Sequence, residues 1–163
     1  MSIQANSIDF KMMNRAIELA LDAENEGNLP IGCVICLDHE IIAEGRNTML
    51  FPVFNPGMHA EMNAIGNVSS GLWARANEMI CYTTLEPCCM CFGRILLCGI
   101  GKVVFGALDT EGGSGCLLHH LPRYYSKQNI PRWQGPIMPE VCDDLYKRAA
   151  LMFGKINLQI NKD

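Results

Sequence analysis

The sequence has few charged residues, no excess of positive charge and no long apolar run. Charged side chains make up 18% of the 163 residues and apolar ones 49%, a balance that excludes an intrinsically disordered chain. The net charge of −4 gives no sign of the basic surface on which phosphate-binding proteins depend, which counts against a nucleic-acid partner. No apolar stretch approaches the roughly 20 residues that span a bilayer, so no membrane segment is expected.

The N-terminal residues also lack the basic start and apolar run of a signal peptide, so the chain is expected to be cytoplasmic. Nine cysteines are a high and odd number, and several stand inside apolar runs, as Cys33, Cys36 and Cys81 do. This placement indicates reduced, buried thiols and not a disulfide framework. The length corresponds to one domain, for which residues 1–163 are taken.

Apolar spacing and turn residues predict helices that alternate with short strands. Helices are expected over residues 8–26, 59–68, 88–98 and 139–153, and strands over 31–37, 41–43, 79–84 and 102–107. Residues 45–58 are expected to be a loop, and 109–135 an irregular stretch. Strands that alternate with helices imply a sheet covered on both sides, so the expected fold class is α/β.

Two short segments carry the residues that suggest chemistry, His59-Ala60-Glu61 and Pro87-Cys88-Cys89-Met90-Cys91. Cys88 and Cys91 are three residues apart, so at a helix start their thiolates can point to the same spot. A helix N-terminus also favours the thiolate form. His59 stands at the start of the other helix and could supply a third ligand.

Three protein ligands leave a fourth tetrahedral position for water, which is typical of a catalytic zinc ion. Zinc lowers the pKa of such a water from about 15.7 to roughly 7. Glu61 is placed to take the proton of this water and pass it to a leaving nitrogen. A C-x-x-C pair alone also occurs in structural zinc half-sites and redox pairs. The two segments together, in this order, are the signature of zinc nucleobase deaminases.

On these residues the chain resembles the cytidine-deaminase-like superfamily, above all its bacterial tRNA adenosine deaminases and its free-base cytosine, isocytosine and guanine deaminases. The resemblance runs from about residue 16 to 153, and it is strongest in Pro30–Gly32, Glu44–Asn47, His59–Glu61, Tyr82–Cys88 and Val103–Ala107. It implies a three-layer α/β/α sandwich with a mixed sheet of about five strands. It also implies a homodimer or higher homo-oligomer, Zn²⁺ held by His59, Cys88 and Cys91, and Glu61 as the proton shuttle.

The same resemblance assigns four residues to substrate binding. The amide of Asn47 would hold the base ring, the backbone N–H of Ala60 would bind a ring carbonyl or nitrogen, and the carbonyl of Pro87 would orient the departing amine. Asp109 matches the residue that the tRNA enzymes carry at this position and is assigned to the same group. Asparagine is also common in turns, which is the other interpretation of Asn47.

The implied reaction replaces an amino group on a ring by a carbonyl and releases ammonia. The chain departs from the tRNA enzymes at Leu108, where they commonly carry a basic residue, in a tail with few charges, and in the loop Asn55–Met58. These departures favour a free nucleobase or small nucleoside of the cytosine, isocytosine or guanine type. A tRNA-specific adenosine deaminase is the alternative, and a non-catalytic zinc-binding module is the remote one.

Two aromatic segments leave alternatives open. Phe51 and Phe54 could stack on a flat ring or fill a dimer interface. The stretch from Leu118 to Trp133 interleaves aromatic with basic residues. That pattern can bind single-stranded nucleic acid, form a lid over a small pocket, or pack as a surface loop.

Overall fold

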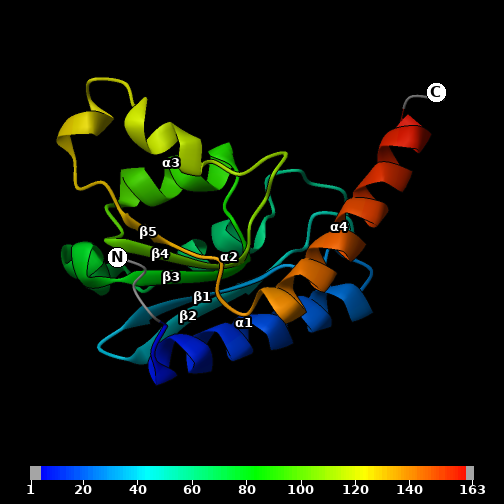
Figure 1. Ribbon diagram of the computed structural model, residues 1–163, viewed down its shortest axis with the longest axis horizontal. Coiled ribbons are helices and arrows are strands. Elements are labelled where there is room, and N and C mark those ends of the chain that lie inside the picture. Colours follow the sequence, from blue (N-terminus) through cyan, green and yellow to red (C-terminus); the bar gives the residue numbers. More distant parts are fainter. Residues whose placement is uncertain (1–4, 161–163) are drawn as a thin grey trace.

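The computed structural model describes the backbone of residues 5–160 and the side chains up to residue 154. A five-stranded sheet has the order β2-β1-β3-β4-β5 (Figure 1). Its strands are β1 (Gly32–Leu37), β2 (Glu40–Arg46), β3 (Ile80–Leu85), β4 (Lys102–Ala107) and β5 (Arg132–Gln134). β1 is antiparallel to β2 and β3, whereas β3, β4 and β5 run parallel, so the sheet is mixed.

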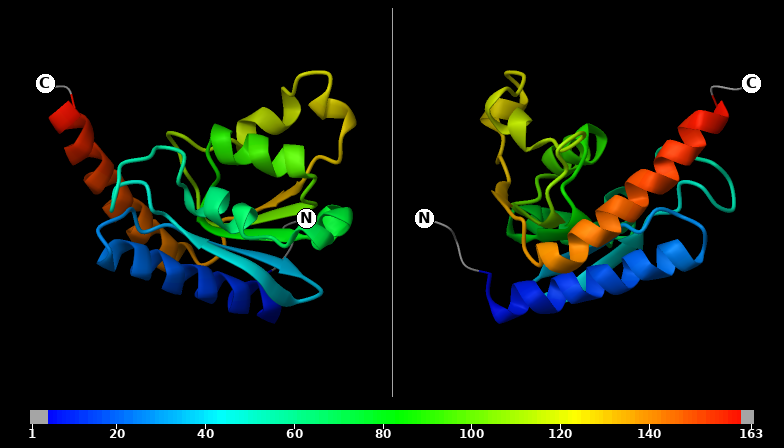
Figure 2. Two further views of the ribbon diagram at one scale, coloured as in Figure 1. Left: turned by 180° about the vertical axis from the view of Figure 1, so that it is seen from behind. Right: turned by 45° about the vertical axis from the view of Figure 1, so that its right-hand side comes forward.

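The helices cover both faces of this sheet. They are α1 (Ser7–Asn25), α2 (Ala60–Gly66), α3 (Cys89–Cys98) and α4 (Pro139–Ile160), with 3-10 helices η1 (Ser70–Glu78), η2 (Gly115–His119) and η3 (Tyr125–Lys127). Figures 1 and 2 show α1 and α4 on one face and α2 and α3 on the other. The expected α/β/α sandwich is confirmed. Within residues 5–160 no helix is long and apolar enough to cross a bilayer.

Two apolar layers form because successive residues of a strand point to opposite faces of the sheet. In β1, Cys33 and Ile35 lie in the layer under α2 and α3, while Val34 and Cys36 lie in the layer under α1 and α4. All six residues of β1 are buried. A strand covered on both faces is a continuous apolar run, which makes it recognisable in the sequence.

The first helix begins at a capping box that also anchors it to the sheet. The Asn6 side chain accepts hydrogen bonds from the N–H groups of Ile8 and Asp9, and the Asp9 carboxylate accepts one from Asn6 N–H. The second oxygen of Asp9 accepts a hydrogen bond from the Tyr82 hydroxyl at 2.8 Å. This buried contact fixes the start of α1 against β3.

Several elements differ from the sequence-based expectation. β5 lies in the stretch expected to be irregular, and α4 continues to Ile160, beyond the expected end at residue 153. β5 has three residues and pairs with β4 at the edge of the sheet, so it shows little apolar alternation. β2 extends over Glu40–Arg46, past the apolar residues 41–43, because its polar ends also pair with β1. β1 and β2 form an antiparallel hairpin.

Candidate active site

The starts of α2 and α3 bring three ligand-type side chains together. His59 is the N-cap residue of α2 and Cys88 that of α3, and both have extended backbone. Neither side chain caps its own helix, so the imidazole and the thiol can face each other. Cys91 lies three residues further along α3, on the same helix face as Cys88.

The close approach of α2 to β2 sets the position of His59. Gly45 of β2 lies against the α2 backbone, where an added Cβ would stand 2.3 Å from Ala64 N and 2.4 Å from Ala60 O. Glycine in a strand interior is typical of such an approach between two backbones. A larger residue at this position would push the start of α2, and His59 with it, away from the sheet.

The imidazole and the two thiols have the spacing of ligands around one tetrahedral zinc ion. Their donor atoms lie within 4.8 Å of one another. His59 Nδ1 is 3.6 Å from Cys88 Sγ and 3.6 Å from Cys91 Sγ. Ligands at Zn–S and Zn–N distances of about 2.3 Å and about 2.05 Å stand about 3.6 Å apart at a tetrahedral angle. The donor set and its geometry therefore both fit zinc.

These three groups also perturb one another's protonation. Hydrogen bonding with Cys91, and then with His59, lowers the pKa of Cys88 to about 4. The contact with Cys88, together with burial, raises the pKa of Cys91. The contact with Cys88 raises the pKa of His59. One thiolate is therefore present at neutral pH, and the thiolate is the form that binds a metal cation.

Glu61 lies beside this cluster without belonging to it. The side chain is buried, and burial raises the pKa of its carboxyl. Oε2 lies 3.4 Å from Cys91 Sγ, and Oε1 accepts a hydrogen bond from the Thr83 hydroxyl at 3.0 Å. A buried carboxyl with a raised pKa is suited to taking up and returning a proton.

A second C-x-x-C pair, Cys33 and Cys36, stands on β1 and has a different arrangement. On a strand this spacing sends the two side chains to opposite faces, and each enters a different apolar layer. Cys33 contacts Cys81 instead, with the sulfur atoms 3.5 Å apart in the core. All nine cysteines are free thiols, as the sequence predicted.

Asn47 follows β2 and is fully buried. Its Oδ1 accepts a hydrogen bond from Met49 N–H at 3.0 Å, as in an Asx turn. Its Nδ2 is also buried and has no hydrogen-bond partner among the described residues. The oxygen thus serves the turn, while the amide nitrogen remains able to donate to a ligand.

Ala60 and Pro87 flank the ligand cluster on the two helix starts. Ala60 is buried in the first turn of α2, where backbone N–H groups lack intrahelical partners. The Pro87 carbonyl accepts two hydrogen bonds from Ser114, from its N–H at 3.0 Å and from its hydroxyl at 2.5 Å. Both lone pairs of this oxygen are in use, so orienting a leaving amine would require the Ser114 hydroxyl to turn away.

Asp109 follows β4 and is engaged within the chain. Its Oδ1 accepts hydrogen bonds from the Tyr146 hydroxyl at 2.9 Å and from two backbone N–H groups of its own loop. The residue lines a mostly apolar cavity of about 420 Å³ between this loop and α4. Ile31 lines the same cavity, and its carbonyl accepts a hydrogen bond from Asn47 N–H. Asp109 thus lines a cavity that is connected to Asn47 only through Ile31 and whose lining includes none of the three zinc-ligand residues.

Sequence reasoning missed three residues that shape the site, namely Thr83, Glu86 and Ser114. Glu86 is buried, and its Oε1 accepts hydrogen bonds from Gly115 N–H at 3.0 Å and from the indole of Trp133 at 3.3 Å. It thereby fixes the loop next to the start of α3. A carboxylate at the end of an apolar strand is a signal that could have singled out Glu86; Thr83 and Ser114 gave none.

An α/β/α sandwich with this cluster at two helix starts defines a zinc-dependent deaminase. Residues 6–107 match the model for the cytidine and deoxycytidylate deaminase zinc-binding region, and the chain belongs to that family. The resemblance drawn from the sequence and the zinc cofactor are thereby confirmed. The same holds for the class of reaction, a hydrolytic deamination.

Similar proteins include several tRNA-specific adenosine deaminases. That of Bacillus subtilis (strain 168) is 42% identical over 116 residues, which cover 69% of this chain and 71% of the relative. That of Haemophilus influenzae is 36% identical over 140 residues, which cover 84% of this chain and 80% of the relative.

Solved structures of several deaminases share the fold. One comes from work on A-to-I editing by tRNA:A34 deaminases at the wobble position of transfer RNA. It has a TM-score of 0.71 at 25% identity and covers 83% of this chain and 99% of its own. The guanine deaminase of Nitrosomonas europaea has a TM-score of 0.66 at 19% identity, covering 91% and 87%. At that identity the second similarity shows the fold alone.

Proposed function

We propose that this protein is a tRNA adenosine deaminase, which converts an adenosine of tRNA to inosine and releases ammonia. The observation that carries the proposal is the 42% identity over 116 residues to a tRNA-specific adenosine deaminase. The guanine deaminase shares the fold at 19% identity and gives no comparable support. The alternative that the sequence left open is thus better supported than the small substrate expected first.

In this proposal His59, Cys88 and Cys91 hold the zinc ion, and three protein donors leave room for a fourth. Bound there, zinc supplies Lewis acidity that makes a water molecule a nucleophile near neutral pH. The two thiols and the imidazole fix the position of that chemistry, because each is held on a helix start by backbone geometry.

Glu61 moves the protons. Its carboxylate takes a proton from the attacking water and passes it to the ring nitrogen next to the reacting carbon. The hydroxyl then on that carbon gives a second proton, through the same carboxylate, to the amino group; the carbon–nitrogen bond breaks, ammonia leaves and the oxygen stays as the carbonyl. The Thr83 hydroxyl holds Oε1, which leaves Oε2 on the side of Cys91 and the cluster. One buried group can therefore serve as base and then as acid.

The substrate contacts are proposed on the same grounds. The unpartnered Nδ2 of Asn47 donates to an acceptor on the base ring. The Ala60 N–H at the start of α2 binds a ring nitrogen. The Pro87 carbonyl receives the departing amine once the Ser114 hydroxyl has turned away. Asp109 stands at the wall of the neighbouring cavity, where a nucleotide next to the target could lie.

A small-substrate deaminase is the second candidate, and two observations favour it. The net charge is −4, and Leu108 stands where the tRNA enzymes commonly carry a basic residue. Leu108 is exposed, so it offers an apolar contact where a phosphate would favour a cation. Neither observation bears on the chemistry, which is the same for both substrates.

A substrate panel separates the two candidates. The zinc-loaded protein is incubated with a tRNA anticodon stem-loop carrying adenosine at the wobble position, and with cytosine, isocytosine, guanine and the ribonucleosides. We expect inosine in the RNA and little ammonia from the small compounds. Rapid ammonia release from one small compound, with the RNA unchanged, would overturn the tRNA proposal and favour the second candidate.

Replacing Thr83 with valine is expected to lower kcat about tenfold and to leave KM within about twofold. Valine has the shape of threonine but lacks the hydroxyl that donates to Glu61 Oε1, and a hydrogen bond to a charged group contributes about 1.5–3 kcal/mol. Steady-state inosine formation measures both constants. Thr83→Ser keeps the hydroxyl and is the matched control. Equal kcat for the serine and valine variants would contradict the role of this contact.

Assembly and location stay predictions. A homodimer or higher homo-oligomer, a cytoplasmic location and one domain over residues 1–163 are all expected from the sequence and from the family resemblance. Light scattering on the purified protein measures the first of these directly. Phe51 and Phe54 are exposed in the single chain, which is compatible with both roles expected for them.

A further inference from the structure

Residues 112–139, the basic segment, form the cationic part of an acidic protein. They contain no aspartate or glutamate, and they contain Arg123, Lys127 and Arg132. Within the described chain none of these three takes part in an ion pair, whereas four of the other arginines do. The positive charge of the basic segment is therefore available to an external anion.

The basic segment starts at the candidate active site. Ser114 is hydrogen-bonded through both its N–H and its hydroxyl to the Pro87 carbonyl, directly before the N-cap of α3. Gly113 forms a β-bridge with Cys88. From this anchor the segment turns back over α3, as Figure 1 shows in yellow.

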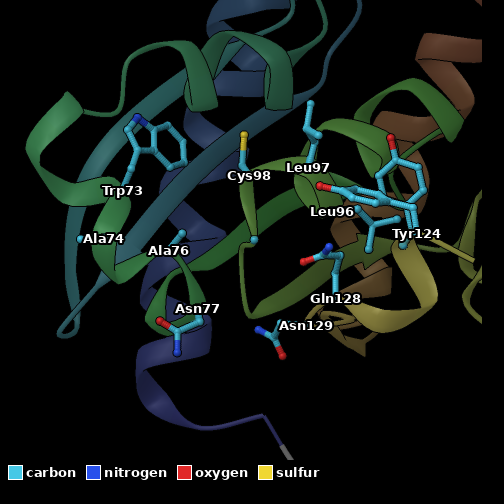
Figure 3. Close-up of a pocket in the computed structure, with 12 residues that line it drawn as sticks. Trp73, Ala74, Ala76, Asn77, Leu96, Leu97, Cys98, Tyr124, Gln128 and Asn129 are labelled. Atoms are coloured by element: carbon cyan, nitrogen blue, oxygen red, sulfur yellow. The ribbon is translucent and has the colours of Figure 1, made fainter.

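Two cavities lie between the basic segment and α3. One, of about 240 Å³, includes Cys89 next to the metal ligands and His120 of the segment. The other, of about 290 Å³, lies at the far end of α3 and is shown in Figure 3. Leu96 and Tyr125 line both, so the two cavities are neighbours in one groove, the α3 groove. The 10 residues of α3 give this groove a length of about 15 Å.

The cavity at the far end has the chemistry of a site for a neutral flat ring. Three amide side chains and the rings of Trp73 and Tyr124 line it, and none of its lining side chains is charged (Figure 3). The amides belong to Asn77, Gln128 and Asn129. Amides offer donors and acceptors together, as the edge of a nucleobase requires, and aromatic rings stack on its face.

Two cations stand next to the tyrosines of this groove in the chain, outside the lining of the two cavities. Arg123 and Lys127 flank Tyr124 and Tyr125, whose rings meet edge to face with centroids 5.1 Å apart. Both cations and Tyr124 are exposed. Exposed cations next to aromatic rings are the combination that binds the phosphates and stacks the bases of a single strand.

We propose that the α3 groove binds single-stranded RNA, namely nucleotides on one side of the target adenosine, with one base in the cavity of Figure 3. The proposal rests on the proposed function, since it places the rest of the same substrate. The α3 groove, about 15 Å long, has the length of about four nucleotides stacked at 3.4 Å. Charge complementarity favours RNA over a second copy of this chain as the partner of the basic segment. A phosphate backbone carries one negative charge per nucleotide, whereas a whole second copy carries a net charge of only −4.

Binding of a fluorescein-labelled anticodon stem-loop, measured by anisotropy at several salt concentrations, tests the groove. The double variant Arg123→Ala/Lys127→Ala is expected to raise Kd at least about tenfold and to lower the log–log salt slope by about 1.4, the loss of two phosphate contacts. Lys11→Ala/Lys147→Ala removes the same charge from exposed positions on α1 and α4, and it should bind like the unmodified protein.

A second pair of variants tests stacking without changing charge. Tyr124→Ala is expected to weaken RNA binding at least about fivefold, while Tyr124→Phe keeps the ring and the affinity. Unchanged affinity in both Tyr124→Ala and the double arginine–lysine variant would overturn the proposal. So would a change of oligomeric state in these variants with RNA affinity kept, because the groove would then be an interface between copies.

Inosine formation, measured separately, distinguishes this proposal from the proposed function. If the RNA binds through the groove but is never deaminated, the function fails and the groove stands. If inosine forms at the same kcat/KM in all the variants, the function stands and the groove fails.

Discussion

Glutamine in place of Glu61 is expected to lower kcat by about 10³-fold and to leave the zinc content of the purified protein unchanged. Glutamine has the size of glutamate and can still accept the hydrogen bond from Thr83. It cannot carry a proton, and general acid–base catalysis contributes about 10²–10⁴-fold to such reactions. Zinc stays bound because Glu61 lies outside the ligand cluster. Single-turnover inosine formation and elemental analysis measure the two quantities.

The control for Glu61→Gln is the same substitution at an exposed glutamate. Glu40 lies at the start of β2, and Glu40→Gln should retain both activity and zinc. Activity within about tenfold of the unmodified protein in Glu61→Gln would contradict the proton-shuttle role. Zinc-loaded, unmodified protein that deaminates nothing in the panel would favour the remote alternative of a non-catalytic zinc-binding module.

The ligand cluster could be predicted from the sequence because its geometry is mostly local. Cys88 and Cys91 are three residues apart at the start of α3, and helix geometry alone puts them on one face. The helix starts were also predictable, since each follows a strand or loop with a clear change of pattern. What the sequence could not give is the 3.6 Å spacing to His59, which depends on the approach of α2 to β2 at Gly45.

The hydrogen bonds that position Glu61 and the Pro87 carbonyl join residues far apart in the chain, and they produce no recognisable pattern in the sequence. Thr83 meets Glu61 across 22 residues of sequence, and Ser114 meets Pro87 across 27. In a strand, Thr83 is indistinguishable from the other β-branched residues that favour that conformation. Such pairs form only when strand register and helix placement are known.

The sequence did not predict β5 or the last turns of α4, and the reason is a different one. β5 is held by Trp133, which packs against Phe92 and Phe105 at centroid distances of 5.4 and 5.9 Å, and not by any alternation of its own. In α4, Gly154 lowers helix propensity just after Phe153, so the apolar pattern fades while the helix continues. Tertiary packing therefore forms β5, and helix propagation extends α4, although the local sequence pattern predicts neither.

The substrate was the least predictable property, because charge was averaged over the chain. A net charge of −4 counts against a nucleic-acid partner only if the cations are spread evenly. In the structure the acids and several arginines pair with each other, whereas the basic segment keeps its charge. The local charge of the basic segment, and not the net charge of the whole chain, is the quantity that bears on RNA binding.

Serine in place of Cys91 is expected to remove zinc and to abolish deamination, whereas serine in place of the adjacent Cys89 should leave the zinc content unchanged. Cys91 is buried within 3.6 Å of His59 Nδ1, while Cys89 is exposed and points elsewhere from the same helix turn. A hydroxyl is a poor substitute for a thiolate ligand, and even outer-shell changes cost about 10–100-fold in metal affinity. Elemental analysis, thermal unfolding and inosine formation are measured on both variants. Full zinc content and activity in Cys91→Ser, or loss of zinc in Cys89→Ser, would contradict the assignment of the three ligands.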